Sequence, residues 1–445
     1  MRRTFAVLLL LGLFACWRSV QAQDSNYWSE QYGTRSELLG GAVVGSPQDL
    51  STTFYNPGGL SRLKTESFLL SAKALEYQRL TAKESSGRFT DLAHDRFGVA
   101  PSLFAGTFPR SWTTATLAYS LLTRQRFEFR IDNWTDLATS SFGDSVARNS
   151  YIDGRIAEQW GGLTWSRPAG DFGLGATLYG AYRSQRSRIE ALEQPQSTGP
   201  SGVAVAFVDD YSYWHVRLLA KLGVHWEYEH ISVGITFTTP GLPLFGDGKA
   251  AAYRSVVPID STSGVPTITE AIVANDPSVT YRSPASVAIG GRYGAGRNAF
   301  YVTLEWFDSV ERYRVLDAPE VPDSGPGSLL GANITQELNS VVNFVVGYEY
   351  SPREQLTFYG SFLANFSSST EDPGAAHTFS TWDIYQFTGG AAFTYQQMDF
   401  TLGASVAAGG EELNFQNDVW AAPIIDPVDI RYRRVRFFIG FEFGQ

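Results

Sequence analysis

The chain has 445 residues and a formal net charge of −10 at pH 7. This acidic balance argues against a nucleic-acid partner, because phosphate backbones are bound by basic surfaces. Aromatic residues make up 14% of the chain, glycine accounts for 43 residues and methionine for only 2. Length alone would suggest two or three domains, but no Pro/Ser-rich linker or helical repeat divides the chain. The composition favours one large β protein, either secreted or embedded in a membrane.

The first 22 residues have the features of a secretory signal peptide. A basic start and an apolar run at residues 5–15 precede a small-x-small cleavage site that ends at Ala22. The only cysteine is Cys16, so cleavage after Ala22 would leave a chain without disulfides or thiolate metal sites. The stretch “LFAC”, which ends at Cys16, leaves lipoprotein processing as the alternative.

The segment from Tyr213 to Glu229, “YWHVRLLAKLGVHWEYE”, separates a membrane barrel from a soluble β protein. One face is apolar and includes Trp214 and Trp226, while the other face carries most of the polar residues. Twelve residues at about 3.3 Å each, tilted by about 45°, span roughly 28 Å. This length matches the hydrocarbon core of a bilayer, with an aromatic ring at each interface. The segment therefore favours a strand that crosses a membrane.

The same alternation recurs and predicts fourteen strands. Their expected ranges are 66–82, 94–108, 112–132, 154–168, 171–190, 203–229, 231–256, 279–294, 298–316, 337–351, 354–368, 383–397, 398–410 and 431–444. Short turns then alternate with long loops near 83–93, 133–153, 191–202, 257–278, 317–336, 369–382 and 411–430. Short periplasmic turns and long outer loops are typical of outer-membrane barrels. We expect an all-β fold, a 14-stranded antiparallel transmembrane β-barrel.

Residues suited to catalysis or metal binding are few. The stretch “HWEYEH” places His225, Glu227 and Glu229 on one strand face, where they could suit a transition metal. However, alternate residues of a strand lie nearly 7 Å apart, so we expect a hydrated, charged lumen near the periplasmic rim and no metal site. No Gly-x-Ser-x-Gly motif appears, so we expect no enzyme. A barrel lipase or protease built from distant strands is the alternative.

The stretch “TTPGLPLFGDG”, residues 238–248, is unusually apolar for an exposed connection. Leu242, Leu244 and Phe245 would face water there unless they bind something, and exposed apolar clusters often mark binding surfaces. We expect these three residues to take part in substrate capture. The alternative is a loop that folds back onto its own barrel.

Three stretches resemble the long-chain fatty acid transporter family of outer-membrane proteins, which includes aromatic-hydrocarbon transporters. They are “QYGTRSELLGGAVVGSPQDLSTTFYNPGGL” at 31–60, “APSLFAGTF” at 100–108 and “GITFTTPGLPLFGDG” at 234–248. The resemblance extends over most of the chain that follows the signal peptide. It implies a fourteen-stranded barrel at residues 63–445 whose lumen is plugged by an N-terminal hatch at residues 23–62.

The hatch of this family carries an Asn-Pro-Ala motif, which is matched here by Asn-Pro-Gly. The expected gate residues are Phe54, Tyr55, Asn56, Pro57, Gly58 and Gly59. We expect Phe54 and Tyr55 to pack inside the lumen and Pro57 to fix a backbone dihedral. Because glycine adds backbone freedom, Gly58 in place of alanine predicts a looser turn. A simple linker turn is the alternative.

The resemblance implies facilitated diffusion of hydrophobic compounds, such as long-chain fatty acids, across a bacterial outer membrane. Apolar outer loops would capture the ligand and pass it to a pocket inside the barrel. A shift of the hatch would then open a route to a lateral exit at a kinked third strand. The resemblance implies no cofactor, and a monomer surrounded by outer-membrane lipid and lipopolysaccharide.

No local motif marks the pocket residues. A basic lumen residue such as Arg217 or Lys221 could meet a carboxylate. Fatty acid, monoaromatic and alkane substrates are not separable from the chain. A plain porin and an adhesin-like barrel are further alternatives to a transporter of hydrophobic compounds.

Overall fold

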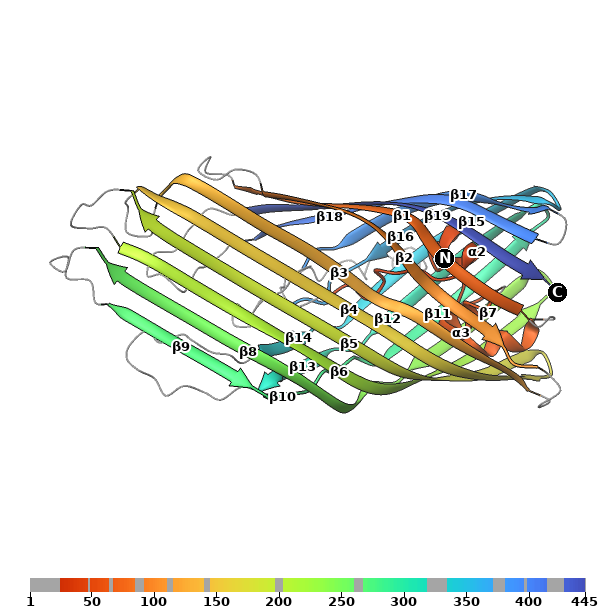
Figure 1. Cartoon of the computed structure of the whole chain (residues 1–445). Coiled ribbons are helices and arrows are strands. Elements are labelled where there is room, and N and C mark those ends of the chain that lie inside the picture. Colours follow the sequence, from red (N-terminus) through yellow and green to blue (C-terminus); the bar gives the residue numbers. More distant parts are fainter. Residues whose placement is uncertain are drawn as a thin grey trace, which may run out of the picture.

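The computed structural model describes most of the chain between Ser25 and Gly444 (Figure 1). The described residues are 25–46, 49–63, 67–84, 92–109, 115–139, 145–196, 203–259, 267–317, 334–370, 381–395, 398–413 and 428–444. The predicted signal peptide at residues 1–22, which includes Cys16, lies outside them.

Fourteen antiparallel strands form a closed barrel. The sheet runs β5-β4-β3-β2-β1-β19-β18-β17-β16-β15-β12-β11-β7-β6, and pairing of β5 with β6 closes it. Two strands are interrupted: β7 and β8 both pair with β6, while β11 and β9 pair with β7 and β8 respectively. The predicted fold class and strand number are therefore confirmed.

The wall strands are β1 (Ser67–Glu84), β2 (Leu92–Thr107), β3 (Thr116–Thr139), β4 (Ser145–Ala169), β5 (Phe172–Pro195), β6 (Val203–Tyr228), β7 (Ile231–Thr238), β8 (Leu242–Pro258), β9 (Ile268–Asn275), β11 (Ser286–Ala295), β12 (Asn298–Phe307), β15 (Val341–Arg353), β16 (Leu356–Asn365), β17 (Ile384–Tyr395), β18 (Met398–Leu413) and β19 (Val428–Gly444).

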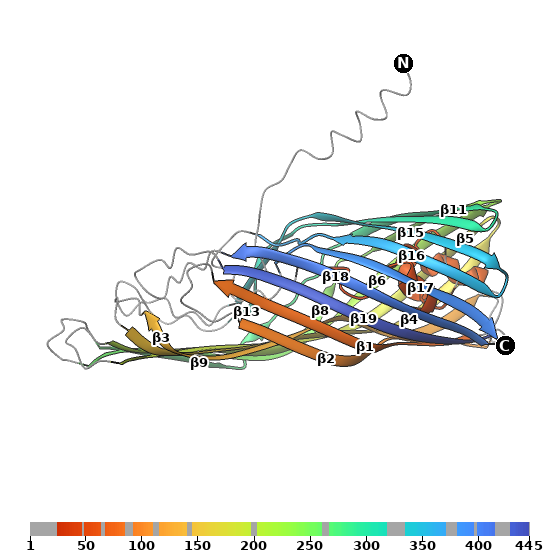
Figure 2. The same cartoon turned by 90° about the horizontal axis from the view of Figure 1, so that it is seen from above.

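Several strands are longer than predicted. β3 reaches Thr139 and β4 begins at Ser145, so most of the predicted loop 133–153 is strand. Figure 2 shows that β3 and its neighbours up to β9 extend beyond the rest of the barrel. In “SVARNSYID”, residues 145–153, polar residues dominate both faces, so the alternation that marks a half-apolar strand is lost.

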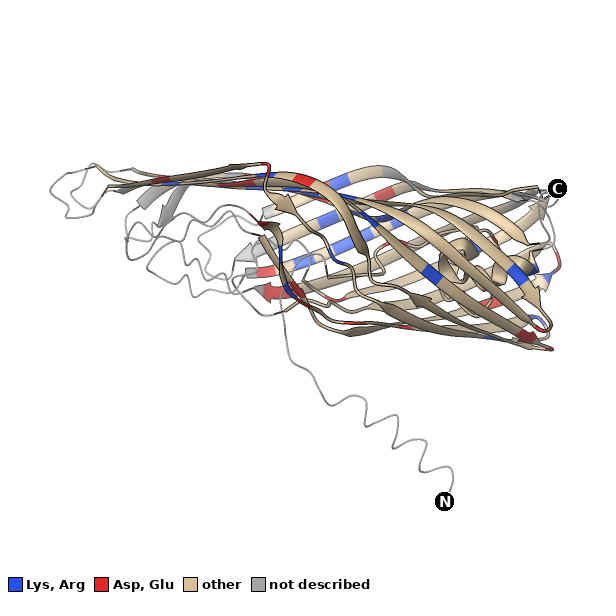
Figure 3. Cartoon of the chain, turned by 90° about the horizontal axis from the view of Figure 1, so that it is seen from below, with Lys and Arg blue, Asp and Glu red and all other residues tan. Residues whose placement is uncertain are grey.

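The outer surface of the barrel carries an apolar band. On β6 the exposed side chains at alternate positions are Leu222 and Val224, with Trp214 and Tyr228 toward the two ends of the band. Figure 3 shows that charged residues are sparse on the half of the wall nearest the C-terminus. Aromatic residues at the edges of an apolar band are typical of membrane barrels. No helix among the described residues is long and apolar enough to cross a membrane.

A second, smaller sheet lies against the inner face of the extended strands. It consists of β10 (Ser278–Val279), β13 (Val310–Asp317) and β14 (Ile334–Leu338). Its apolar residues share a cluster with Tyr211 and Tyr213 of β6. The predicted strand 298–316 is thus two strands, β12 and β13, which belong to different sheets.

The N-terminal segment fills the end of the barrel at which the short turns lie (Figure 2). It contains α2 (Thr34–Leu38), α3 (Thr52–Tyr55) and a 3-10 helix, η2 (Pro57–Arg62). Its leucines are fully buried in one cluster with wall residues: Leu38, Leu39, Leu50 and Leu60. The described residues between 25 and 63 are hereafter called the plug, and they form the core of this half of the barrel.

Glu37 of α2 is an acid buried against the wall. Ser71 of β1 donates a hydrogen bond to it at 3.5 Å. Arg436 of β19 is already paired with two other carboxylates, Glu30 at 2.6 Å and Glu76. Loss of hydration therefore outweighs the attraction of the arginine and raises the pKa of Glu37 to about 8.

We predict that the plug docks less firmly as the pH rises. A carboxyl whose pKa is raised on docking stabilises the docked state fully below its ordinary value of 4.5, and this stabilisation is lost as the pH rises to about 8. Ion conductance of the purified protein in planar bilayers should increase over that interval. Glu37→Gln should flatten the increase, leaving a remainder from Asp49, whose pKa burial also raises. An equal pH dependence in both proteins would contradict the prediction.

Candidate functional site

Asn56 ties the plug to itself and to the wall. Its side-chain Nδ2 donates to the carbonyl oxygen of Val44 at 2.8 Å and to that of Val224 in β6 at 3.0 Å. Its Oδ1 accepts a hydrogen bond from the backbone N–H of Gly58 at 3.1 Å, which caps η2. Asn56 is fully buried. An amide is suited to this position because it supplies donors and an acceptor from one side chain.

Gly58 packs directly against the backbone of the barrel. A Cβ atom added there would lie 2.6 Å from the carbonyl oxygens of both Gly173 in β5 and Gly223 in β6. On the wall side, a Cβ at Gly175 would meet the carbonyl oxygen of Pro57 at 2.3 Å. The expectation of a looser turn is wrong, because glycine here permits a backbone contact that alanine would prevent.

Phe54 and Tyr55 lie inside the lumen, as predicted. Phe54 packs edge-on against Tyr32, with ring centroids 4.6 Å apart. The Tyr55 hydroxyl accepts a hydrogen bond from the backbone N–H of Tyr32 at 3.1 Å. Phe54 also faces the cavity above the plug, which makes it the link between the gate residues and the pocket.

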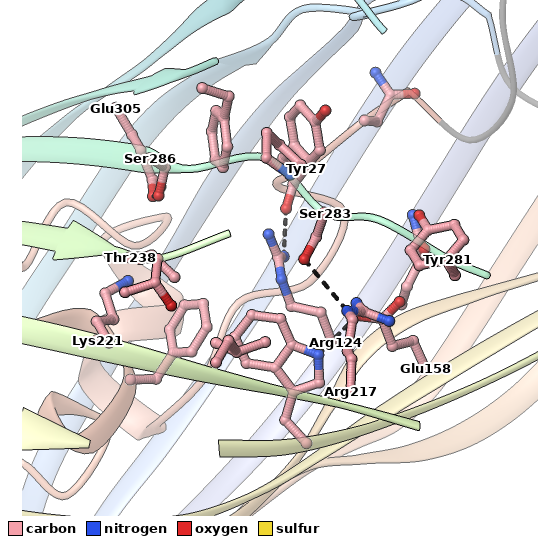
Figure 4. A pocket seen from close by; sticks show the side chains of 18 residues that line it. Tyr27, Arg124, Glu158, Arg217, Lys221, Thr238, Tyr281, Ser283, Ser286 and Glu305 are labelled. Atoms are coloured by element: carbon pink, nitrogen blue, oxygen red, sulfur yellow. Dashed lines mark hydrogen bonds and ion pairs between the residues drawn. The ribbon is translucent and has the colours of Figure 1, made fainter. Parts of the chain in front are cut away.

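A cavity of about 60 Å³ lies between the plug and the upper lumen (Figure 4). Its walls combine aromatic rings with charged groups. The lining residues used below are Phe54, Arg124, Glu158, Trp160, Arg217, Lys221, Tyr281 and Glu305. An apolar cavity of about 150 Å³ is known to bind benzene, so this space is too small for even one aromatic ring. The structure is a closed state.

The cations that line the cavity differ in their partners. Arg217 pairs with Glu158 at 2.5 Å, and Glu158 also pairs with Arg183 at 3.1 Å. Lys221 places its Nζ 4.5 Å from the centroid of the Phe54 ring. No carboxylate among the described residues lies within ion-pair distance of Lys221. Of the two basic residues named from the sequence, Arg217 shares the carboxylate of Glu158 with Arg183, whereas Lys221 has no carboxylate within ion-pair distance among the described residues.

The wall opens beside this cavity. β2 and β3 pair only from Leu103–Leu122 to Thr107–Ala118, and β3 has a bulge between Thr123 and Gln125. Tyr32 of the plug donates a hydrogen bond to the carbonyl oxygen of Thr123 at 3.0 Å, which satisfies an acceptor at the bulge. The resemblance implied a kinked third strand with a lateral exit; β3 has a bulge here, and the exit stays a prediction.

Leu242, Leu244 and Phe245 lie in β8 and not in a loop. The expectation of an outer loop at residues 238–248 is therefore wrong. The break in the strand is limited to Thr239-Pro240-Gly241, where Pro240 cannot donate to the ladder. The three side chains are 60%, 51% and 59% exposed. Their expected exposure is therefore confirmed, but they lie in a strand of the wall and not in a loop. Their role in capture stays a prediction.

The “HWEYEH” residues are not brought together. His225 is buried and shares a hydrogen bond of 2.9 Å with Ser232, whereas Glu227 and Glu229 are exposed beside the turn.

Three residues that line the cavity, Arg124, Glu158 and Tyr281, were not predicted from the sequence. Glu158 stands on the polar face of a predicted strand, which was a usable signal. Arg124 follows the bulge of β3, and Tyr281 lies outside any strand, so neither position could be assigned from alternation.

Comparisons with solved structures identify the fold of this chain. The chain matches no protein-family model, and no curated protein matches its sequence. A FadL homologue of Pseudomonas aeruginosa is 11% identical, with a TM-score of 0.61 over 94% of this chain and 99% of that chain. The P. putida toluene transporter TodX is 11% identical, with a TM-score of 0.62 over 94% of this chain and 99% of that chain. The Ralstonia pickettii toluene transporter TbuX is 12% identical, with a TM-score of 0.58 over 93% of this chain and 98% of that chain.

This chain has the FadL-type barrel fold. Identities this low establish the fold alone, because one fold hosts many functions. The transport function is therefore argued from the plug, the cavity and the openings of the wall.

We predict that Gly58→Ala loosens the plug. The added methyl group must displace two wall carbonyls, and overpacking of this kind costs about 1–3 kcal/mol. Single-channel recordings should show a higher open probability for ions than in the unmodified protein. Gly360→Ala is the matched control, because a Cβ at Gly360 in β16 would meet nothing within 4 Å. Equal conductance in the two variants would show that the contact at Gly58 does not hold the plug.

Proposed function

We propose that the protein is an outer-membrane channel that admits hydrophobic compounds by diffusion, with long-chain fatty acids as the preferred class. The apolar outer band and the fold shared with FadL and TodX support the location. The buried plug and the small closed cavity argue against a plain porin, which has a water-filled lumen. The proposed transport uses no ATP and no coupled carrier, and it is driven by the concentration gradient of the ligand.

The observation that carries the proposed substrate class is the Lys221 ammonium. It lies beside aromatic rings in the cavity, where Glu305 attracts it, but no carboxylate among the described residues is within ion-pair distance. A buried, unpaired charge is costly, and a ligand carboxylate would remove that cost. Phe54 and Trp160 would contact the start of the hydrocarbon chain. An amphipathic acid fits this combination better than toluene, which can offer the ammonium only the face of a ring, as Phe54 already does.

Entry of such a ligand requires the plug to move, because the cavity is too small for it. Phe54 links the cavity to the gate residues Tyr55, Asn56, Pro57, Gly58 and Gly59. We propose that a ligand which displaces the Phe54 ring weakens the Asn56 anchor on β6. The opening between β2 and β3 then provides the lateral exit that the resemblance implies.

We predict that Lys221→Gln lowers the affinity for oleate roughly tenfold, since hydrogen bonds to charged groups contribute about 1.5–3 kcal/mol. Toluene affinity should stay unchanged. Isothermal titration of the detergent-solubilised protein with each ligand measures both. Lys249→Gln serves as the control, because Lys249 is an exposed lysine of β8. Equal losses for oleate and toluene would favour a structural role of Lys221 and argue against a fatty acid site.

A plain porin is tested by conductance. The intact protein should conduct few ions in planar bilayers, and deletion of residues 25–60 should raise the conductance to that of an open barrel. Barrel assembly of both proteins is checked by heat-modifiable migration in gels. High conductance of the intact protein would overturn the channel proposed here in favour of a porin.

A further inference from the structure

The seventh and eighth strands of the wall separate in the middle and rejoin in the same register. β7 pairs with β11 up to Thr238–Ser286, and β8 pairs with β9 from Lys249–Asn275 onward. Ten residues lie between these pairs on each side, 239–248 and 276–285. Matching numbers on both sides mean that an uninterrupted ladder could have formed.

One backbone hydrogen bond of that ladder persists, from the N–H of Gly241 to the carbonyl oxygen of Ser283 at 3.2 Å. Above it, residues 242–248 pair with β6 on one side and with no strand of the described chain on the other. We call the opening between 242–248 and 276–282 the window. Unpaired strand edges at membrane depth are costly, so a window in the wall calls for an explanation.

The outer rim of the window is apolar and lies near the outer end of the apolar band. Four consecutive residues, 242–245, are exposed, and the usual alternation is interrupted by a bulge at Leu244, between the pairs Val216–Phe245 and Arg217–Pro243. Phe245 lies opposite Val216 of β6 and stacks edge-on with Trp214 at 5.9 Å. Since aromatic residues mark the ends of the band, the window faces the outer leaflet.

The inner side of the window is closed by a single segment, residues 279–284. Thr280 donates its N–H to Val315 of β13 at 2.9 Å, so the segment has left the wall for the inner sheet. The ring of Tyr281 lies 4.2 Å from the guanidinium carbon of Arg183 and 4.8 Å from that of Arg217. Figure 4 shows Tyr281 and Ser283 facing the cavity.

Two glycines, one directly before β8 and one within it, let this segment lie close to the rim. A Cβ atom at Gly241 would meet the Oγ of Ser283 at 2.5 Å, and one at Gly248 would meet a methyl carbon of Val279 at 2.9 Å. Tyr281, Ser283 and Pro284 line the cavity from within. One layer of chain therefore separates the cavity from the window.

We propose that the window is a second lateral portal, through which a hydrocarbon chain passes between the cavity and the outer leaflet, and that residues 279–284 are its shutter. The inference rests on the proposed function, since it needs a hydrophobic ligand in the cavity. It places Leu242, Leu244 and Phe245 on the lipid-facing rim, where they contact the chain of the ligand. The portal is separate from the opening between β2 and β3, which lies on other strands.

A disulfide between Gly241→Cys and Ser283→Cys tests the shutter. The two positions are hydrogen-bonded neighbours, and the only natural cysteine is Cys16. The probe is a palmitate with a terminal diazirine, photoactivated in proteoliposomes, and labelling of the peptide that contains Phe54, on the cavity side of the shutter, is measured by mass spectrometry. The reduced variant should be labelled, and oxidation should lower the labelling at least fivefold. Equal labelling in both forms would overturn the portal.

A cross-link elsewhere in the wall supplies the control. Val302→Cys with Val346→Cys joins β12 and β15 at facing positions of an intact ladder, so its oxidation should leave the labelling at Phe54 unchanged. Tyr281→Ala provides a second test, because removal of the ring should raise the labelling at Phe54. No increase in that variant would also count against the shutter.

Uptake separates this inference from the proposed function. Radiolabelled oleate is offered to cells that depend on the reduced double-cysteine protein. Absence of oleate uptake both in these cells and in cells with the unmodified protein would refute the transport function itself. Uptake that proceeds equally after oxidation, together with unchanged labelling, would refute the portal and leave the transport function standing.

Discussion

The structure depends on the need of every backbone N–H and C=O group in a membrane to find a partner. Closure of the sheet through β1–β19 and β5–β6 meets this need around the circumference. Among the described residues, pairing stops between β2 and β3 and between β8 and the segment after β9, and each interruption has a physical cost. Tyr32 compensates one of them by donating to Thr123. Both lie beside the same cavity, so the departures from the rule coincide with the site.

The plug imposes a second constraint, which is the close approach of two backbones. Gly58 meets Gly173 and Gly223, and Gly45 meets Gly290, at distances that leave no room for a Cβ atom. Hydrogen bonds from Asn56 and Tyr179 then fix the plug to the wall. Each of these hydrogen bonds contributes only about 1 kcal/mol, and release of the plug would also expose the apolar core that Leu38, Leu39, Leu50 and Leu60 form with the wall.

The fold was largely predictable because alternation with period two reports which strand face meets lipid. This alternation was a good guide to β6, whose apolar face runs from Trp214 to Tyr228, and it failed for residues 145–153, where polar residues occupy both faces. The site was less predictable. Phe54 and Asn56 could be named from a local turn, whereas Arg124 and Tyr281 owe their positions to a bulge and to a segment that leaves the wall. The fit of Gly58 depends on Gly173 and Gly223, more than one hundred residues away, so no local pattern could reveal it.

The closed cavity sets a condition on any ligand. A ligand shifts the plug only by the difference between its affinities for the open and closed states, and a cavity of about 60 Å³ gives almost no affinity in the closed state. Nearly all the binding free energy is therefore available for opening. Lys221 also directs where the ligand acts on the plug. A carboxylate that approaches the Lys221 ammonium must displace the ring of Phe54, whose centroid lies 4.5 Å from the ammonium nitrogen. Lys221, which we propose recognises the ligand, and Phe54 of the plug are thus in contact before the ligand arrives.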